Sequence, residues 1–150
     1  MTDDPTGDAG WPRYCCAILR DERGRYLLEK RPDHDDDLPG KLVCFGGGRE
    51  PDEHPDASIR RELVEELGIA PERLEFCVRL MGTSGRVIGW FYRGEAPRPE
   101  QIVTEAGVEA VWADWDELRL LPVGLWNLAA IEAERRGEPV AIVNDEPRTK

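Results

Sequence analysis

Short apolar runs separated by turn-forming residues dominate the first third of the chain. The runs at 13–20 and 26–31 predict the two strands of a hairpin, because Gly24 between them tolerates the positive φ that a tight turn needs. An acidic loop, RPDHDDDLPG, follows and ends in a Pro-Gly turn signal. Residues 41–45 then predict a short strand, and the glycine run Gly46–Gly48 leads out of it.

One helix is predicted after the glycine run. Its apolar residues recur at helical spacing: Ala57, Ile59, Leu63 and Leu67. Pro55 suits the first turn of a helix, and Gly68 suits its end because glycine readily takes the left-handed conformation of a helix cap. We therefore expect this helix to pack one face against a core.

The second half of the chain returns to strand-like patterning before it ends in helices. Residues 74–82 and 86–95 are strand-like segments, which predicts two antiparallel strands joined across Thr83-Ser84-Gly85. Residues 107–114 predict another strand, and the segment DWDELRLLP resembles a short capped helix. Apolar residues at helical spacing predict a final helix over 122–137.

The order of these elements is strands, a helix, strands, and a second helix. This order predicts an α+β fold in which a mixed β-sheet is sandwiched between helices. The chain has 150 residues, which fits one domain with a substantial core, and we place that domain at 13–137. Residues 1–12 are polar and predict a flexible N-terminal arm, while residues 138–150 predict a mobile C-terminal tail.

The charge balance narrows the classes of function. The formal net charge is −11, so the chain lacks the basic surface that nucleic acids and anionic membranes require, and we expect neither as a partner. No apolar run is long enough to cross a bilayer, and the first residues show no signal peptide, so we expect a cytoplasmic protein. A small phosphorylated ligand is compatible with this charge, because a divalent cation reverses the local sign.

The cysteines do not predict a metal site. Cys15, Cys16, Cys44 and Cys77 show no CxxC spacing, and the two histidines do not pair with them as zinc ligands would. We expect four buried thiols in a reducing compartment.

Glutamates concentrate on one stripe of the predicted helix. A helix advances about 100° per residue, so Glu62, Glu65 and Glu66 share a face beside the apolar one. Like charges at this spacing lower helix stability, so the segment is either an ion-paired surface helix or a site for cations such as Mg²⁺, which prefer carboxylate oxygens. Arg61 can pair with a carboxylate, and Gly46–Gly48 let the backbone approach a metal or a phosphate closely.

The same segment resembles a known family signature. Gly47, five residues, Glu53, seven residues, Arg61-Glu62-Leu63, one residue, Glu65-Glu66, one residue and Gly68-Ile69 form the complete Nudix box over residues 47–69. The chain therefore resembles a Nudix hydrolase, and the flanking pattern extends the resemblance from about residue 13 to 136. The resemblance implies a loop–helix–loop on an α/β/α sandwich. It also implies that Mg²⁺ or Mn²⁺ supports hydrolysis of a nucleoside diphosphate linked to another group.

The resemblance also assigns metal ligands. It implies that Glu62, Glu65 and Glu66 bind the cation, with Glu66 foremost, and that the carbonyl of Gly46 or Gly47 adds a ligand. One or more cations would bind the diphosphate and lower the pKa of a bound water, which a carboxylate then deprotonates for in-line attack.

Other box residues receive supporting roles in catalysis. By the same resemblance, Arg61 and Glu53 organise the loop and the helix. Family members often take a further ligand or a general base from a loop after the box. The segment TEAGVEAVW resembles that loop, so Glu105 is our candidate and Glu109 is the second choice.

The chain departs from relatives that cleave nucleoside triphosphates. Many of them read Phe-Pro-Gly-Gly-Lys where this chain has CFGGG, so Gly48 replaces a lysine that contacts phosphate. Four basic residues are candidates for the missing contact: Lys30, Arg31, Lys41 and Arg49. We select Arg31 and Arg49 as substrate-binding residues, and Asn127 near the start of the last helix as a base-reading residue.

The leading hypothesis is a Mg²⁺-dependent pyrophosphohydrolase. It would cleave a diphosphate linkage in a small nucleotide or nucleoside diphosphate derivative, of the NTP, dNTP or nucleotide-sugar class. One alternative is a catalytically silent Nudix-fold module that binds or senses nucleotides, and another is a purely structural cation site. The complete set of box carboxylates favours the enzyme. Homodimers are common in the family, and no pattern in the sequence marks an interface.

Overall fold

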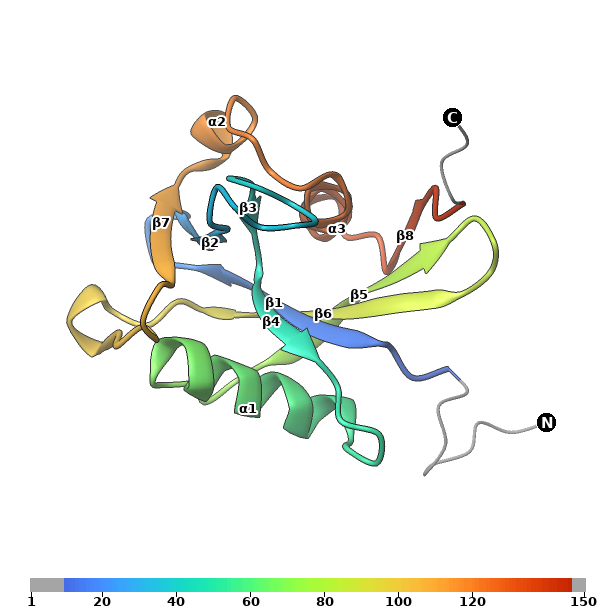
Figure 1. Ribbon diagram of the computed structural model, residues 1–150, viewed down its shortest axis with the longest axis horizontal. Helices are drawn as coiled ribbons and strands as arrows, with labels where there is room; N and C mark the ends of the chain where they lie inside the picture. The colour runs from blue at the N-terminus through green and yellow to red at the C-terminus, as the bar shows by residue number, and fades with distance from the viewer. Residues whose placement is uncertain (1–9, 147–150) are drawn as a thin grey trace.

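A computed structural model describes residues 10–146 of the chain (Figure 1). The strands are β1 (Tyr14–Arg20), β2 (Tyr26–Lys30), β3 (Leu42–Val43), β4 (Phe45–Gly48), β5 (Glu75–Gly82), β6 (Val87–Glu95), β7 (Glu109–Ala113) and β8 (Val140–Val143). The helices are α1 (Pro55–Leu67), α2 (Trp115–Leu118) and α3 (Leu125–Arg136), and a 3-10 turn, η1, spans Pro99–Gln101. The predicted strands other than 41–45 agree with these bounds to within two residues.

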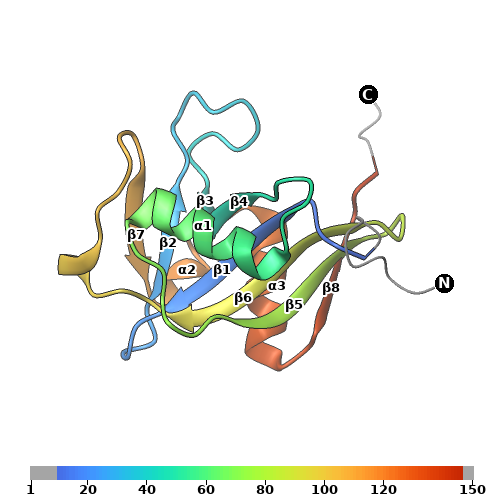
Figure 2. The same ribbon diagram turned by 90° about the horizontal axis from the view of Figure 1, so that it is seen from below.

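The strands form one mixed sheet between two helices. Its order is β3-β2-β1-β6-β5-β8, while β4 pairs with β1 and β7 pairs with β2. The β1–β6 and β5–β8 pairs are parallel and the other strand pairs are antiparallel. Helix α1 packs on β1 and β4, whereas α3 packs on β5 and β8 from the opposite face (Figures 1 and 2). Within the described part of the chain, no helix has the length and apolarity needed to cross a bilayer.

Strand β1 separates two hydrophobic cores. Cys15, Ala17 and Leu19 belong to the core under α1, while Cys16 and Ile18 belong to the core under α3. A strand buried on both faces needs an unbroken apolar sequence rather than an alternating one, which explains the run YCCAIL. The four cysteines are free thiols. Cys15, Cys16 and Cys44 are buried as expected, whereas Cys77 is only half-buried.

The glycine run is part of the sheet and not a loop. Strand β1 pairs with β2 only near Leu19 and Arg20, so its first half is open to another partner. Strand β4 takes that place, with Cys15 opposite Gly47. The predicted strand at 41–45 is therefore wrong as a single unit, because the chain leaves β2 after β3 and moves to β1.

The C-terminal segment also differs from the prediction. A mobile tail over 138–150 is wrong for Val140–Val143, which form β8 alongside β5. The final helix begins at Leu125 instead of residue 122, and Val123 pairs with Leu42 in an isolated bridge. Residues 147–150, and residues 1–9 of the predicted arm, lie outside the described residues.

Candidate functional site

Helix α1 carries the glutamate stripe and is held at both ends. At its start, Nδ1 of His54 accepts a hydrogen bond from the Asp56 backbone N–H at 3.0 Å. At its end, Gly68 takes a left-handed conformation with φ 79°. Ile59, Leu63 and Leu67 are fully buried under the sheet, as expected. Ala57 was also assigned to this face but is exposed, and Ser58 is buried instead, because the buried stripe shifts by one residue in the first turn.

The burial of that face turns Glu62 and Glu66 toward β4. The Gly46 backbone N–H donates to Oε1 of Glu66 at 2.9 Å. The Glu62 carboxylate lies directly against Gly47, where a Cβ atom would be 2.3 Å from Oε1 of Glu62. Gly46 is also constrained by the sheet, because its φ is 147° and a Cβ atom there would lie 2.1 Å from the Cys15 carbonyl oxygen.

Arg61 connects the loop before α1 to the helix. Its Nε and Nη2 atoms contact the two oxygens of Glu53 at 2.7 and 2.9 Å, and Nη2 also donates to the Gly48 carbonyl at 3.0 Å. Its Nη1 atom contacts Glu62 at 2.9 Å. The hydrogen bonds from Arg61 lower the pKa of Glu53 to about 2, so this pair is ionised at neutral pH.

Glu65 does not join the other two glutamates of the stripe. Its side chain is 52% exposed, and its contact is with Nη1 of Arg61 at 3.2 Å. The sequence placed Glu62, Glu65 and Glu66 on one stripe, but only Glu62 and Glu66 turn toward the glycines of β4. Glu65 marks the solvent edge of the stripe.

A buried glutamate that the sequence analysis did not select faces the same region. Glu29 on β2 is only 6% exposed. Burial raises its pKa, and the carboxylates of Glu105 and Glu62 act in the same direction. The signal was present in the sequence, since YLLEK places one carboxylate in a strand whose preceding residues are all core residues.

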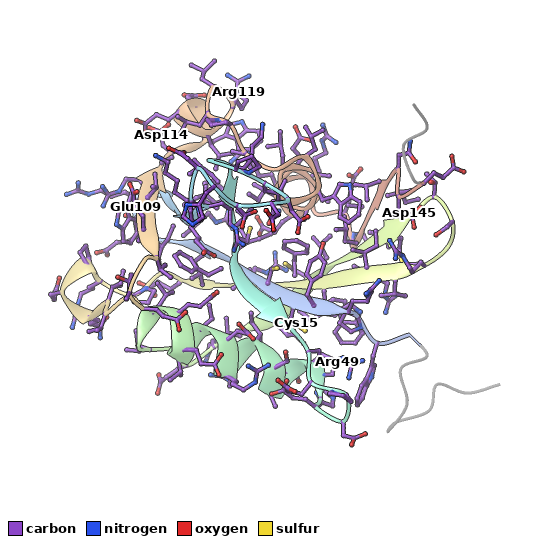
Figure 3. The ribbon with its side chains drawn as sticks, in the orientation of Figure 1. Cys15, Arg49, Glu109, Asp114, Arg119 and Asp145 are labelled. Atoms are coloured by element: carbon purple, nitrogen blue, oxygen red, sulfur yellow. The ribbon has the colours of Figure 1, made fainter. Side chains whose placement is uncertain are left out.

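Glu105 lies in the turn that precedes β7. The Val108 N–H donates to its backbone carbonyl at 3.0 Å, and β7 then pairs with β2. The Glu105 side chain is exposed and has no hydrogen-bond or ion-pair partner among residues 10–146, but its charge acts on both Glu29 and Glu66. Glu109, the second choice, is exposed on β7 opposite Lys30 (Figure 3).

Among these carboxylates, Glu66 has the most strongly shifted pKa. Burial raises the pKa of Glu66 to about 8, and the negative charges of Glu29, Glu62 and Glu105 add to this effect. The hydrogen bond from Gly46 opposes it only in part. A carboxyl group in this environment holds a proton near neutral pH unless a positive charge comes close.

The donor chemistry at this location suits Mg²⁺ or Mn²⁺. The converging groups are carboxylates and peptide carbonyls, with no imidazole among them, and hard cations prefer such oxygen ligands. Within residues 10–146, no three acidic, His or Cys side chains are already gathered as a finished cation site. Arg61 engages Glu62, and the Gly46 N–H engages Glu66.

The three residues selected for substrate binding have different surroundings. Arg49 donates to the backbone carbonyls of Pro12, Glu50, Pro51 and Glu53 and lies over the Trp11 ring, near the start of α1 (Figure 3). Asn127 accepts a hydrogen bond from the Cys44 N–H at 3.0 Å. These contacts hold loops and helix α3 in place. Arg31 is half-exposed and lies between Glu29, at 3.5 Å, and Asp35, at 2.6 Å.

A separate hollow of about 1290 Å³ lies beyond the C-terminal end of α1. Arg60, Arg73 and Arg98 are among its lining residues, and none of the four converging glutamates lines it. We therefore place the candidate site at the carboxylates of α1 rather than in this hollow.

Comparisons with known proteins agree with the box. A family model described as NUDIX domain matches residues 11–133. Human diphosphoinositol polyphosphate phosphohydrolase 3-alpha is 28% identical over 116 residues, which cover 77% of this chain and 61% of the human protein. The nucleoside triphosphatase NudI of Escherichia coli O1:K1 / APEC is 42% identical over 53 residues, or 35% of this chain and 37% of NudI. The chain thus spans less than two thirds of either relative.

Solved structures show the same fold. A MutT NUDIX hydrolase from Burkholderia pseudomallei superposes with a TM-score of 0.66 at 28% identity, covering 81% of this chain and 96% of that one. The predicted α+β sandwich is thereby confirmed.

Proposed function

Because the chain belongs to the Nudix family, we propose that it is a Mg²⁺- or Mn²⁺-dependent pyrophosphohydrolase acting on a nucleotide derivative. One observation carries the proposal: Glu62 and Glu66 are held against glycines that admit no side chain, and the negative charges of Glu29 on β2 and Glu105 in the turn before β7 act on Glu66. A solvated surface helix has no need of such close packing against backbone.

The chain's own residues would divide the work as follows. Glu62, Glu66 and a peptide carbonyl of Gly46 or Gly47 would hold the cation, which supplies charge neutralisation and acidifies water when bound. Glu53 and Arg61 fix the loop to the helix, so the carboxylates keep their positions. Glu105 would accept the proton of the attacking water, because it is exposed and its oxygens are free of partners within residues 10–146.

The charge around the site favours a nucleotide over a more anionic substrate. Gly48 stands where triphosphate-cleaving relatives carry lysine, and Arg49 is committed to backbone carbonyls. Arg31 pairs with the buried Glu29 at 3.5 Å, but it is already shared with Asp35 at 2.6 Å. Diphosphoinositol polyphosphates carry many phosphates, and the carboxylates around the site would repel them. We therefore favour an NTP, dNTP or nucleotide-sugar substrate. The homodimer and the cytoplasmic location stay predictions.

A product assay tests the proposal. The wild-type protein, Glu66→Gln and the exposed-surface control Glu72→Gln are incubated with Mg²⁺ and with NTPs, oxidised dNTPs, nucleotide sugars and a diphosphoinositol polyphosphate. We expect cleavage at a diphosphate by the wild type and the control, and loss of at least about a hundredfold in Glu66→Gln. Nucleotide binding without any product would instead identify a silent binding module, and equal activity in Glu66→Gln would refute the assigned site.

A further inference from the structure

Two glutamates of the chain are buried to the same extent but are neutralised very differently. Glu29 and Glu134 are each 6% exposed. Glu134 on α3 forms ion pairs through Oε2 with two arginines, Arg20 at 2.9 Å and Arg93 at 3.0 Å. Glu29 has one ion pair within the described residues, with Arg31 at 3.5 Å, and that guanidinium is closer to Asp35, at 2.6 Å.

The geometry of Glu134 is that of a structural ion pair, and the geometry of Glu29 is not. A buried carboxylate is costly unless close positive partners and hydrogen bonds compensate it. Glu134 has that compensation on one oxygen, whereas Glu29 shares a more distant partner. Glu29 therefore remains short of positive charge in the protein alone.

The strand register directs Glu29 toward helix α1. Side chains alternate along β2, and Leu27, two residues earlier, packs in the core under α1. Glu29 points to the same side, between Val43 of β3 and Ala110 of β7. Of the charges that act on Glu66, Glu29 exerts the largest effect, ahead of Glu62 and Glu105.

We propose that Glu29 is a positioning residue of the cation site, supplying buried negative charge opposite Glu66 and holding the Arg31 guanidinium at the site's edge. This inference rests on the proposed function, because it concerns the same site. It adds a residue from β2, far in sequence from the glutamate helix, to the groups that set cation affinity. The positive charge of Arg31 beside Glu29 would then compete with a cation for that carboxylate.

Mn²⁺ binding and melting curves separate this role from a structural one. The variants are Glu29→Gln and the matched buried control Glu134→Gln. For Glu29→Gln we expect Mn²⁺ affinity to fall by about ten- to hundredfold, with a metal-free Tm that is unchanged or higher because repulsion is relieved. For Glu134→Gln we expect the reverse pattern: a lower metal-free Tm and unchanged Mn²⁺ affinity. The nucleotide KM should change less than kcat in Glu29→Gln.

A second variant covers the case in which Glu29→Gln fails to fold. Arg31→Gln removes the competing guanidinium, so Mn²⁺ affinity should rise if Glu29 serves the cation. It should stay the same if Glu29 and Arg31 are only a structural pair.

The two proposals fail separately. Retained Mn²⁺ affinity and kcat in Glu29→Gln, together with a lower Tm, would overturn the inference and leave the hydrolase intact. If the wild type cleaves nothing and Glu29→Gln nevertheless lowers Mn²⁺ affinity, the hydrolase proposal is overturned and the inference about Glu29 stands.

Discussion

Gly47 and Gly48 are neighbours with opposite requirements. A Cβ atom on Gly47 would meet the Glu62 carboxylate at 2.3 Å, whereas a Cβ atom on Gly48 would have nothing within 4 Å. Neither residue has a positive φ, so alanine is compatible with the backbone at both positions. The pair therefore isolates the effect of close approach from the effect of glycine flexibility.

Gly47→Ala should impair the site while leaving the fold intact. The new methyl group displaces the Glu62 carboxylate, so we expect kcat to fall by at least about tenfold and Tm to change by a few degrees at most. Gly48→Ala is the control and should stay within about twofold of the wild type. Steady-state kinetics beside thermal melts of both variants provide the check. Equal activity in the two variants would show that the Glu62 position does not matter.

The protonation state of Glu66 makes cation binding depend on pH. With a pKa of about 8 in the metal-free protein, Glu66 must lose a proton before it can bind a cation. Mg²⁺ affinity should therefore rise roughly tenfold per pH unit below about pH 8 and level off above it. Calorimetric titrations in two buffers of different ionisation enthalpy should show proton release at pH 7. Glu66→Gln should remove the release, and its persistence in that variant would assign the proton to another group.

At the scale of elements, the sequence predicts helices from local signals, but it does not predict which distant strands pair. Helix α1 follows from its own spacing and from its ends, Pro55 and Gly68, since each signal lies within the helix. The placement of Glu29 depends on β7, which pairs with β2 although residues 31–108 separate the two strands. Strand β8 is only four residues long, and its pairing with β5 has no local turn to announce it.

The Nudix box names the residues of the candidate site, but it does not tell how their side chains point. A helical stripe grouped Glu62, Glu65 and Glu66, but the tilt of α1 on the sheet decides which of them meet β4. That tilt is set by Ile59, Leu63 and Leu67 in the core, and it leaves Glu65 in solvent. Packing against distant strands, and not periodicity, therefore decides which carboxylates converge.

The joint between the loop and α1 is testable through Arg61. Arg61→Lys keeps the positive charge but loses the two-pronged contact with Glu53 and the bond to the Gly48 carbonyl. We expect a loss of about 1–3 kcal/mol in the free energy of unfolding and a larger proportional loss of kcat. Arg60→Lys is the control, because Arg60 instead bonds the carbonyls of Pro71 and Glu72 after the helix. Denaturant unfolding and steady-state kinetics of both variants provide the check. A loss of activity in Arg60→Lys equal to that in Arg61→Lys would contradict the role assigned to Arg61.

At the scale of the whole molecule, the sheet separates the face that carries the candidate site from the face that α3 covers. The converging carboxylates lie on the α1 face, whereas α3 packs on β5 and β8 across the sheet. Asp145 fastens the end of β8, since it accepts hydrogen bonds from the Ser84 N–H at 3.0 Å and the Thr83 hydroxyl at 3.2 Å (Figure 3). These bonds join the C-terminal strand to the turn between β5 and β6.

Asp145→Asn should therefore weaken the edge of the sheet without changing the chemistry. The amide nitrogen of asparagine cannot accept hydrogen bonds, so some contacts to the β5–β6 turn are lost and β8 opens more often. We expect faster amide hydrogen exchange in Val140–Val143, a Tm lower by a few degrees, and Mn²⁺ affinity and kcat within about twofold of the wild type. Asp36→Asn, an exposed change in the acidic loop, should leave exchange in β8 as it is. Loss of Mn²⁺ affinity in Asp145→Asn would show that the two faces of the sheet are coupled, and the site would then depend on the closure of the whole sheet.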